Sequence, residues 1–331
     1  MKAINLDELF NRFGDIKVGV LGDVMLDTYW WGHVDRISPE APVPVVALDR
    51  REYRIGGAGN VALNLVSLKA KVNILSVMGK DEDGKLLKGL FEEKGIGTEY
   101  LLKRSDRITT NKTRVISRNQ QMMRLDAEIT DDLSEPDEKA LLASVEKYIL
   151  TEKPQVLILE DYNKGVLTDR VIGATLSLCK ANNVLTTVDP KRKNFFNYRG
   201  VDIFKPNLKE VKDALNLILE EVNTESLSNI HQLLQQKLHH QISFITLSEK
   251  GVFYQDGTNA HIFPSHLRNI ADVSGAGDTV IAVASLVYAA THHVGLMAEV
   301  ANIAGGLVCE QVGTVAIDRE QLLTECQLLL S

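Results

Sequence analysis

Short apolar segments alternate with helix-forming segments along most of the chain, and this alternation limits the possible folds more than any other feature. Strands that alternate with helices at such spacing predict a mostly parallel sheet with helices on both faces, a three-layer αβα arrangement. The expected strands are 16–21, 72–77, 156–159, 184–188, 201–204 and 243–247, and the expected helices include 83–94, 168–181, 280–290, 297–311 and 321–330. We therefore expect an α/β protein.

The composition is that of a soluble globular protein. The 331 residues are 44% hydrophobic and 24% charged, and the net charge of −7 argues against nucleic acid as the main partner. The cysteines, Cys179, Cys309 and Cys326, are odd in number and widely spaced, which predicts neither disulfides nor a zinc site and is typical of a reducing cytoplasm. No run approaches the roughly 18 apolar residues that a membrane span requires. We expect a cytoplasmic protein with no membrane partner, folded as one domain over residues 1–331.

A glycine-rich stretch precedes the expected helix 280–290. Gly275 and Gly277 flank Ala276, and Asp278 follows in what would be the first helical turn. Glycines let backbone amides approach an anion at the positive end of a helix, so the stretch predicts a phosphate-binding loop. Asp278 beside that anion has the position of a general base for phosphoryl transfer. An aspartate in a first turn is also a common helix cap, and this alternative remains open.

Two segments do not fit the alternation of strands and helices. Residues from about 28 to 55 carry three prolines between runs of alternating residues, and residues from about 107 to 127 alternate in the same way. Prolines suit edge strands and turns better than a buried parallel sheet. The two segments therefore predict one small β-sheet that stands apart from the main sheet.

Polar residues and glycines follow the first strand and the proline-rich segment. Asp23 and Asp27 follow strand 16–21, at the sheet edge where α/β proteins bind ligands, and could accept hydrogen bonds from sugar hydroxyls. Gly57 and Asn60 lie in Gly-Gly-Ala-Gly-Asn, which opens a helix. Residues 57–62 also fit a dinucleotide-binding G-x-G-x-x-A pattern, but the charged residues 49–54 precede it in place of a buried strand. A nicotinamide oxidoreductase is therefore disfavoured.

Both glycine motifs resemble the two signatures of the PfkB, or ribokinase-like, carbohydrate kinases. Gly-Gly-Ala-Gly-Asn at residues 56–60 resembles the family's G-G-x-G-x-N, with the asparagine one position earlier. The D-x-x-G-A-G-D is present at residues 272–278, and Asn207 and Glu210 fit the N-x-x-E element. The resemblance covers nearly the whole chain. It implies a ribokinase-like fold, ATP and Mg²⁺ as cofactors, a β-sheet lid that often forms a dimer interface, and Asp278 as the base.

The resemblance also assigns roles to particular residues. It implies charge stabilisation by Gly275, Ala276 and Gly277, and magnesium held through water and Glu210. It implies a potassium ion at Asp272 with backbone oxygens of Cys309 and Val312. The sugar would lie on Asp27, Gly57 and Asn60. The expected nucleotide-binding residues are Asn207, Glu210, Thr246, Ser248, Gly251 and Asn302.

Three further strings resemble the heptose 7-phosphate kinases of lipopolysaccharide-core synthesis: residues 36–45, the lid string 117–126 and Asp-Tyr-Asn-Lys-Gly at 161–165. The resemblance implies phosphorylation of the anomeric hydroxyl of D-glycero-β-D-manno-heptose 7-phosphate. A phosphosugar needs nearby cations, and arginine and lysine suit phosphate oxygens. The expected additional substrate residues are Arg118, Gln120, Arg124, Asp161, Lys164, Asp189 and Lys191.

Many of these relatives carry a further nucleotidyltransferase domain, and we expect this chain to perform the kinase step alone. Two alternatives remain. One is a kinase of the same fold that acts on another sugar or a nucleoside. The other is a sugar sensor without turnover, which the presence of Asp278 and both glycines disfavours.

Overall fold

A nine-stranded, mostly parallel sheet forms the centre of the protein in the computed structural model, which describes residues 5–118, 120–257, 259–266 and 268–330. The strand order is β13-β12-β11-β10-β9-β8-β1-β4-β5, and only β12 and β13 run antiparallel to their neighbours. The strands are β1 (Lys17–Gly22), β4 (Lys71–Gly79), β5 (Leu101–Arg104), β8 (Val156–Glu160), β9 (Leu185–Asp189), β10 (Ile203–Phe204), β11 (Ile242–Thr246), β12 (Val252–Asp256) and β13 (Asn259–Phe263).

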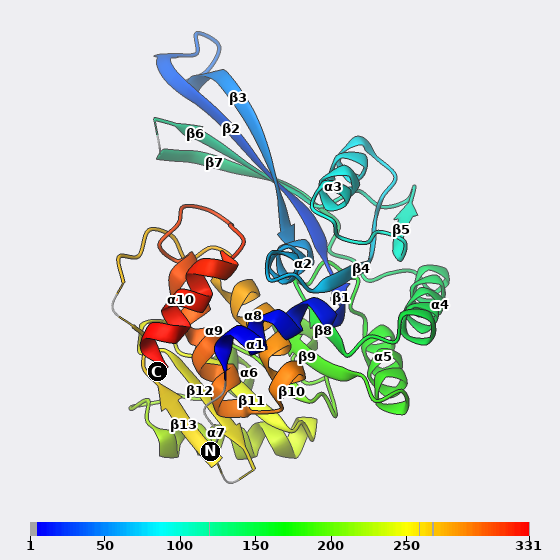
Figure 1. Cartoon of the computed structure of the whole chain (residues 1–331). Helices are drawn as coiled ribbons and strands as arrows, with labels where there is room; N and C mark the ends of the chain where they lie inside the picture. The colour runs from blue at the N-terminus through cyan, green and yellow to red at the C-terminus, as the bar shows by residue number, and fades with distance from the viewer. Residues whose placement is uncertain (1–4, 119, 258, 267, 331) are drawn as a thin grey trace.

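Helices cover both faces of this sheet, as the alternation of strands and helices predicts (Figure 1). One hydrophobic core lies under α1 (Leu6–Arg12), α2 (Ala58–Ser67), α3 (Glu82–Glu93), α8 (Ala276–Thr291), α9 (Val294–Val308) and α10 (Arg319–Leu329). The second core lies under α4 (Glu135–Glu152), α5 (Asp169–Ala181), α6 (Leu208–Leu215) and α7 (Thr224–Leu238). The described helices include none long and apolar enough to cross a bilayer.

A second sheet of four strands, the lid sheet, projects from the body (Figure 1). Its order is β3-β2-β6-β7, and only the β2–β6 pair is parallel. The strands are β2 (Val24–Ile37), β3 (Pro44–Gly57), β6 (Asn111–Ser117) and β7 (Gln120–Ala127). These strands begin and end close to the expected segments 28–55 and 107–127. Asn119, at the β6–β7 turn, lies outside the described residues.

The carboxyl ends of β1 and β8 are in close contact, and this contact shapes the edge where the site forms. A Cβ atom on Gly22 would lie 2.0 Å from the carbonyl oxygen of Glu160, so only glycine fits there. The next residue, Asp23, is buried and accepts backbone hydrogen bonds from Tyr162, Lys164 and Val166 at 2.8 to 3.1 Å. Asp23 therefore orders the loop after β8. Three amides already donate to its oxygens, and its contact with sugar hydroxyls stays a prediction.

Candidate active site

The amino end of α8 exposes backbone amides to an adjacent groove. Gly275 has a φ of 79°, in the left-handed region, and a Cβ atom there would lie 2.8 Å from Nδ2 of Asn60. No side chain caps the helix, and within the described residues the amides of Gly277 and Asp278 donate to no acceptor. Unpaired amides at the positive end of a sixteen-residue helix suit a phosphate group.

Asp278 is buried beside these amides and is held by two donors. Asn60 donates from Nδ2 to Oδ2 at 2.7 Å, and Tyr162 donates its hydroxyl to Oδ1 at 2.7 Å. Burial raises the pKa of Asp278 to about 6, although the hydrogen bonds from Asn60 and Tyr162 act to lower it. A carboxylate fixed in position with a pKa just below neutrality is suited to accept a proton near pH 7.

The Tyr162→Phe substitution should shift the pH dependence of turnover. Because the Tyr162 hydrogen bond lowers the pKa of Asp278, its removal should raise that pKa further. A base must be deprotonated to act. As the pH is lowered, kcat should therefore begin to decrease at a higher pH in the variant than in the native protein. A kcat–pH profile from pH 5 to 9 measures the shift. Tyr254→Phe, at a partly buried tyrosine on β12, is the control. An unchanged acid limb in the Tyr162 variant would argue against the hydrogen-bonded base.

A cluster of buried carboxylates and ammonium groups lies next to Asp278. Asp189, at the end of β9, contacts Nζ of Lys191 and Nζ of Lys205, each at 2.8 Å. Burial raises the pKa of Asp189, but the two ammonium groups outweigh burial and hold that pKa below its ordinary value. Glu160 is fully buried, and neither of its carboxylate oxygens has a partner among the described residues. Burial raises the pKa of Glu160 well above its ordinary value, and the negative charges of Asp189 and Asp278 raise it further.

The three carboxylates of this cluster have the spacing and the donor atoms to hold a hard divalent cation. One oxygen each from Glu160, Asp189 and Asp278 lies within 4.8 Å of the others. Carboxylate oxygens are the ligands that Mg²⁺ prefers. The ammonium groups of Lys191 and Lys205 already neutralise Asp189, so the cluster does not depend on a metal for its charge balance.

A groove of about 1100 Å³ extends from the amino end of α8 along the carboxyl ends of β9 to β11. Its lining includes these expected residues: Asn207, Thr246, Ser248, Gly251, Asn302, Asp189, Lys191 and the stretch 275–278. Gly251 has a φ of 93°, and a Cβ atom there would lie 2.0 Å from the carbonyl oxygen of Phe263. The groove is large enough for a nucleotide.

Glu210 and Asn207 form a capping box at the start of α6. The side chain of Asn207 accepts from the amide of Glu210, and Oε2 of Glu210 accepts from the amide of Asn207, each at 2.8 Å. The second oxygen of Glu210 lies 3.1 Å from Nζ of Lys191. Glu210 thus stabilises the helix and also places a carboxylate beside the groove.

The expected sugar-binding residues Asp27, Gly57 and Asn60 lie where the lid sheet meets α2. Asp27 is buried and pairs with Nη1 of Arg114 at 2.6 Å. Gly57 has a φ of 60°, and a Cβ atom there would lie 2.4 Å from the carbonyl oxygen of Asp23. The Oδ1 atom of Asn60 is buried without a partner among the described residues, so it can accept a hydrogen bond from a ligand.

Several other expected substrate residues make contacts away from the groove. Arg118 is exposed at the lid turn and lies 3.4 Å from Asp35, Gln120 is exposed on β7, and Arg124 forms two hydrogen bonds with Asp126 at 2.7 and 2.8 Å.

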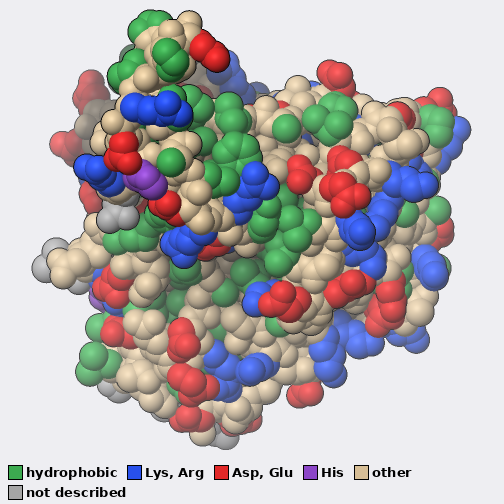
Figure 2. Space-filling view, turned by 90° about the horizontal axis from the view of Figure 1, so that it is seen from above, with side chains coloured by type: hydrophobic (Ala, Val, Ile, Leu, Met, Phe, Trp, Pro, Cys, Tyr) green, Lys and Arg blue, Asp and Glu red, His purple; other side chains and the backbone are tan. Residues whose placement is uncertain are grey.

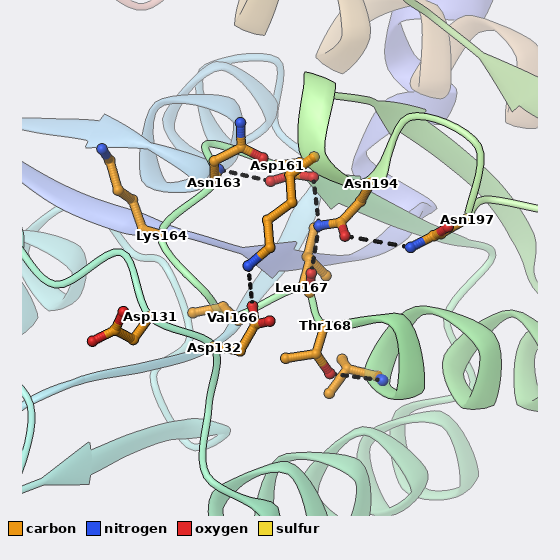
Figure 3. Close-up of polar contacts among 12 residues, drawn as sticks. Asp131, Asp132, Asp161, Asn163, Lys164, Val166, Leu167, Thr168, Asn194 and Asn197 are labelled. Atoms are coloured by element: carbon orange, nitrogen blue, oxygen red, sulfur yellow. Dashed lines mark hydrogen bonds and ion pairs between the residues drawn. The ribbon is translucent and has the colours of Figure 1, made fainter. Parts of the chain in front are cut away.

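Asp161 is buried in the loop after β8, where it accepts hydrogen bonds from the amide of Asn163 and from Nδ2 of Asn194 (Figure 3). It also accepts from the hydroxyl of Tyr198. Its oxygens therefore order the loop. The side chain of Lys164 lies away from Asp161 in Figure 3, and its ammonium contacts Glu128 at 2.8 Å.

Asp272, the expected potassium ligand, orders the loop before α8. Its Oδ1 accepts from the amide and the hydroxyl of Ser274, and its Oδ2 accepts from the amide of Gly313, at 2.8 to 2.9 Å. The carbonyl oxygen of Cys309 accepts from the amides of Ala271 and Asp272. These contacts place Cys309 and Gly313 beside Asp272 without an ion, whereas the carbonyl oxygen of Val312 accepts from Nη1 of Arg54 at 3.4 Å.

Three residues of the site were not selected from the sequence. Tyr162 stands in the 161–165 string but was not assigned a role, Lys205 follows the predicted strand 201–204, and Glu160 follows the predicted strand 156–159. The positions of Lys205 and Glu160 directly after predicted parallel strands could have indicated a role in the site, because the carboxyl ends of such strands lie at one edge of the sheet. For Tyr162 the sequence offered only its position in that string.

The fold and the site together define a class of protein, the carbohydrate kinases with a ribokinase-like fold. The sequence matches the pfkB family of carbohydrate kinases over residues 15–321, and the chain belongs to that family.

Among curated proteins, the chain is 39% identical over 330 residues to the bifunctional protein HldE of Geotalea uraniireducens. It is 37% identical over 324 residues to that of Syntrophotalea carbinolica. These matches cover 98% and 97% of the chain but only 66% and 65% of the relatives, so the chain spans about two thirds of their length.

Solved structures with the same fold have much lower sequence identity. Phosphofructokinase-2 from Escherichia coli, in complex with potassium, has a TM-score of 0.78 at 16% identity, with 96% of this chain and all of that chain covered. Arabidopsis thaliana ribokinase, complexed with ribose and ATP, has a TM-score of 0.73 at 17% identity, with 93% and 98% covered. At this identity the likeness establishes the fold alone.

Proposed function

We propose that the protein transfers a phosphoryl group from ATP to the anomeric hydroxyl of D-glycero-β-D-manno-heptose 7-phosphate. The observation that carries the proposal is the arrangement at α8, where a buried, hydrogen-bonded Asp278 lies beside unpaired helix amides. The heptose substrate is supported by 37–39% identity to proteins named HldE across nearly the whole chain. We also propose that residues 1–331 form one kinase domain and that the protein is cytoplasmic.

The groove supports the nucleotide half of this proposal. The nucleotide would lie between residues 246–251 and α9, with its phosphates at the amides of Gly277 and Asp278. Lys191 and Lys205 both contact Asp189, and Nζ of Lys205 lies 3.8 Å from where a Cβ atom on Gly277 would be, so their charges can stabilise the negative charge that develops during transfer. When bound, Mg²⁺ would neutralise phosphate charge, and Glu210 and the carboxylate cluster are the groups that could hold it, directly or through water.

The sugar would be held, deprotonated and covered by the remaining groups of the site. Asp27 and Oδ1 of Asn60 would accept hydrogen bonds from sugar hydroxyls and orient the ring. Asp278 would take the proton from the reacting hydroxyl as that oxygen attacks the terminal phosphorus. The lid sheet would cover the sugar and exclude water, which would otherwise compete as the acceptor.

A sugar panel tests this function. ADP release with MgATP should be fastest with heptose 7-phosphate, compared with fructose 6-phosphate, ribose and adenosine. A preference for another acceptor would keep the kinase fold and the base but contradict the proposed substrate. Release with none of the four would favour a sugar-binding protein without turnover.

We further propose that two copies associate through the lid sheet and that potassium binds at Asp272. Exposed apolar side chains on the lid sheet and its β2–β3 turn support the association: Ile37, Val43, Leu48, Met122, Met123 and Leu125. Seen from above, hydrophobic side chains gather between charged ones on the exposed surface (Figure 2). A monomer in sedimentation velocity at micromolar concentration would contradict the dimer, and equal turnover in sodium and potassium salts would contradict the potassium site.

A further inference from the structure

One face of the lid sheet carries a row of charged side chains above the sugar-binding residues. In the strand register, Lys112 on β6 lies opposite Asp27 on β2 and opposite Asp126 on β7, and Arg114 lies opposite Arg124. Residues paired in register and two positions apart project from the same face of a sheet. The ion pair between Arg114 and Asp27 shows that this face meets the site.

Lys112 reaches from this face toward the catalytic groups. Its Nζ atom lies 5.8 Å from the centre of the Tyr162 ring, and the hydroxyl of the same tyrosine donates to Asp278. Lys112 and the base therefore contact the same aromatic side chain, one at the ring and the other at the hydroxyl. An anion at Lys112 would be separated from the base by part of the tyrosine ring.

Four other cations on the lid sheet and in the neighbouring loops already have carboxylate partners. The pairs are Arg114 with Asp27, Arg124 with Asp126, Lys164 with Glu128, and Lys191 with Asp189 and Glu210, at 2.6 to 3.1 Å. Lys112 differs, because no carboxylate oxygen of the described residues lies within 4.0 Å of its ammonium group. Of these cations, Lys112 is the one that can accept an anionic ligand without first losing a carboxylate.

The surroundings of Lys112 destabilise its positively charged form. The side chain is partly buried, and burial followed by the nearby charge of Lys164 lowers its pKa from the ordinary value. Asp27 and Glu128 oppose this effect, and Arg124 adds to it. A partly desolvated cation beside another cation is stabilised when an anion binds between them.

We propose that Lys112 binds the phosphate group that the sugar already carries, and that it thereby determines the preference for a phosphorylated over an unphosphorylated sugar. This inference rests on the proposed function as a kinase of a phosphosugar. A sugar phosphate monoester carries a charge between −1 and −2 near neutral pH, and an ammonium donates to its oxygens as a compact positive charge. Lys164, whose own ammonium pairs with Glu128, would add positive potential on the same side.

Calorimetric titration of heptose 7-phosphate, and of the same heptose without its phosphate, tests this assignment in the native protein and in Lys112→Met. The native protein should bind the phosphorylated sugar more tightly. The substitution should weaken that binding by about 10- to 100-fold, the range expected for one charge-assisted hydrogen bond, and leave the unphosphorylated heptose within about twofold. Lys112→Arg should restore part of the affinity. Arg36→Met, which removes an exposed cation from the same sheet, should change neither affinity.

Equal weakening of both sugars by Lys112→Met would overturn the inference, because it would indicate a structural role of Lys112 against Tyr162. Unchanged affinity for heptose 7-phosphate, or no preference for it in the native protein, would also overturn it. The function is read separately from ADP release. Binding with the expected dependence on Lys112 but without ADP release would support the phosphate site and contradict the kinase proposal.

Discussion

The Asp278→Asn substitution should lower kcat by about 10²- to 10⁴-fold, the usual contribution of a general base. The amide has nearly the same shape as the carboxylate, so an oxygen can still accept from Asn60 or Tyr162, but the group can no longer take a proton. Both ligands should therefore still bind, with KM for ATP and for the sugar close to the native values. Steady-state ADP release at saturating substrates measures the loss.

A matched control separates loss of the base from loss of charge in the groove. Asp213 also lines the groove but is exposed and lies on α6, away from the amino end of α8. Asp213→Asn should leave kcat within about threefold of the native value, the range for a charge that does not contact the reacting atoms. If Asp278→Asn retained turnover in that same range, Asp278 would not be the base.

Replacement of Lys205 by methionine should destabilise the protein by about 3 kcal/mol, because removal of one partner from a buried ion pair leaves a poorly compensated charge. Lys205 is 2% exposed, and its Nζ atom contacts Oδ2 of Asp189 at 2.8 Å. Lys191 can compensate only part of the charge, since it pairs with the other oxygen of Asp189 and also with Glu210. Urea unfolding at pH 7.5 measures the change in the free energy of unfolding.

The control for this prediction is Lys250→Met. Lys250 lines the same groove, but it is exposed and has no ion pair among the described residues. Surface substitutions of this kind usually change stability by less than about 0.5 kcal/mol. A Lys205 variant as stable as the Lys250 variant would show that the Asp189 carboxylate does not need both ammonium groups.

Much of the fold follows from local sequence patterns. The order of strands and helices, the glycine turn before α8 and the separate lid sheet all depend on periodicity, prolines and glycines within short windows. One strand was predicted too long, because β10 forms only over Ile203–Phe204 within the expected 201–204. The expected helix 297–311 begins three residues earlier and ends at Val308.

Contacts within the site could be predicted less well, because they join distant parts of the chain. Asn60 and Tyr162 lie 218 and 116 residues from Asp278, and no local pattern states that both donate to it. The sequence shows that Asp161 and Asp23 follow strands, but only the folded loop shows that backbone or neighbouring side-chain donors occupy their oxygens. Likewise, the pairing of each arginine or lysine depends on strand register.

The central claim concerns a phosphoryl transfer to one defined oxygen, and ³¹P NMR of the product tests it most directly. Incubation of the protein with MgATP and D-glycero-β-D-manno-heptose 7-phosphate should produce a new phosphate signal coupled to the anomeric proton, while the 7-phosphate signal persists. The same reaction with Asp278→Asn should show neither a new sugar phosphate nor ADP over the same time. A new phosphate on another sugar carbon, or ADP and inorganic phosphate without any new sugar phosphate, would contradict the proposed reaction.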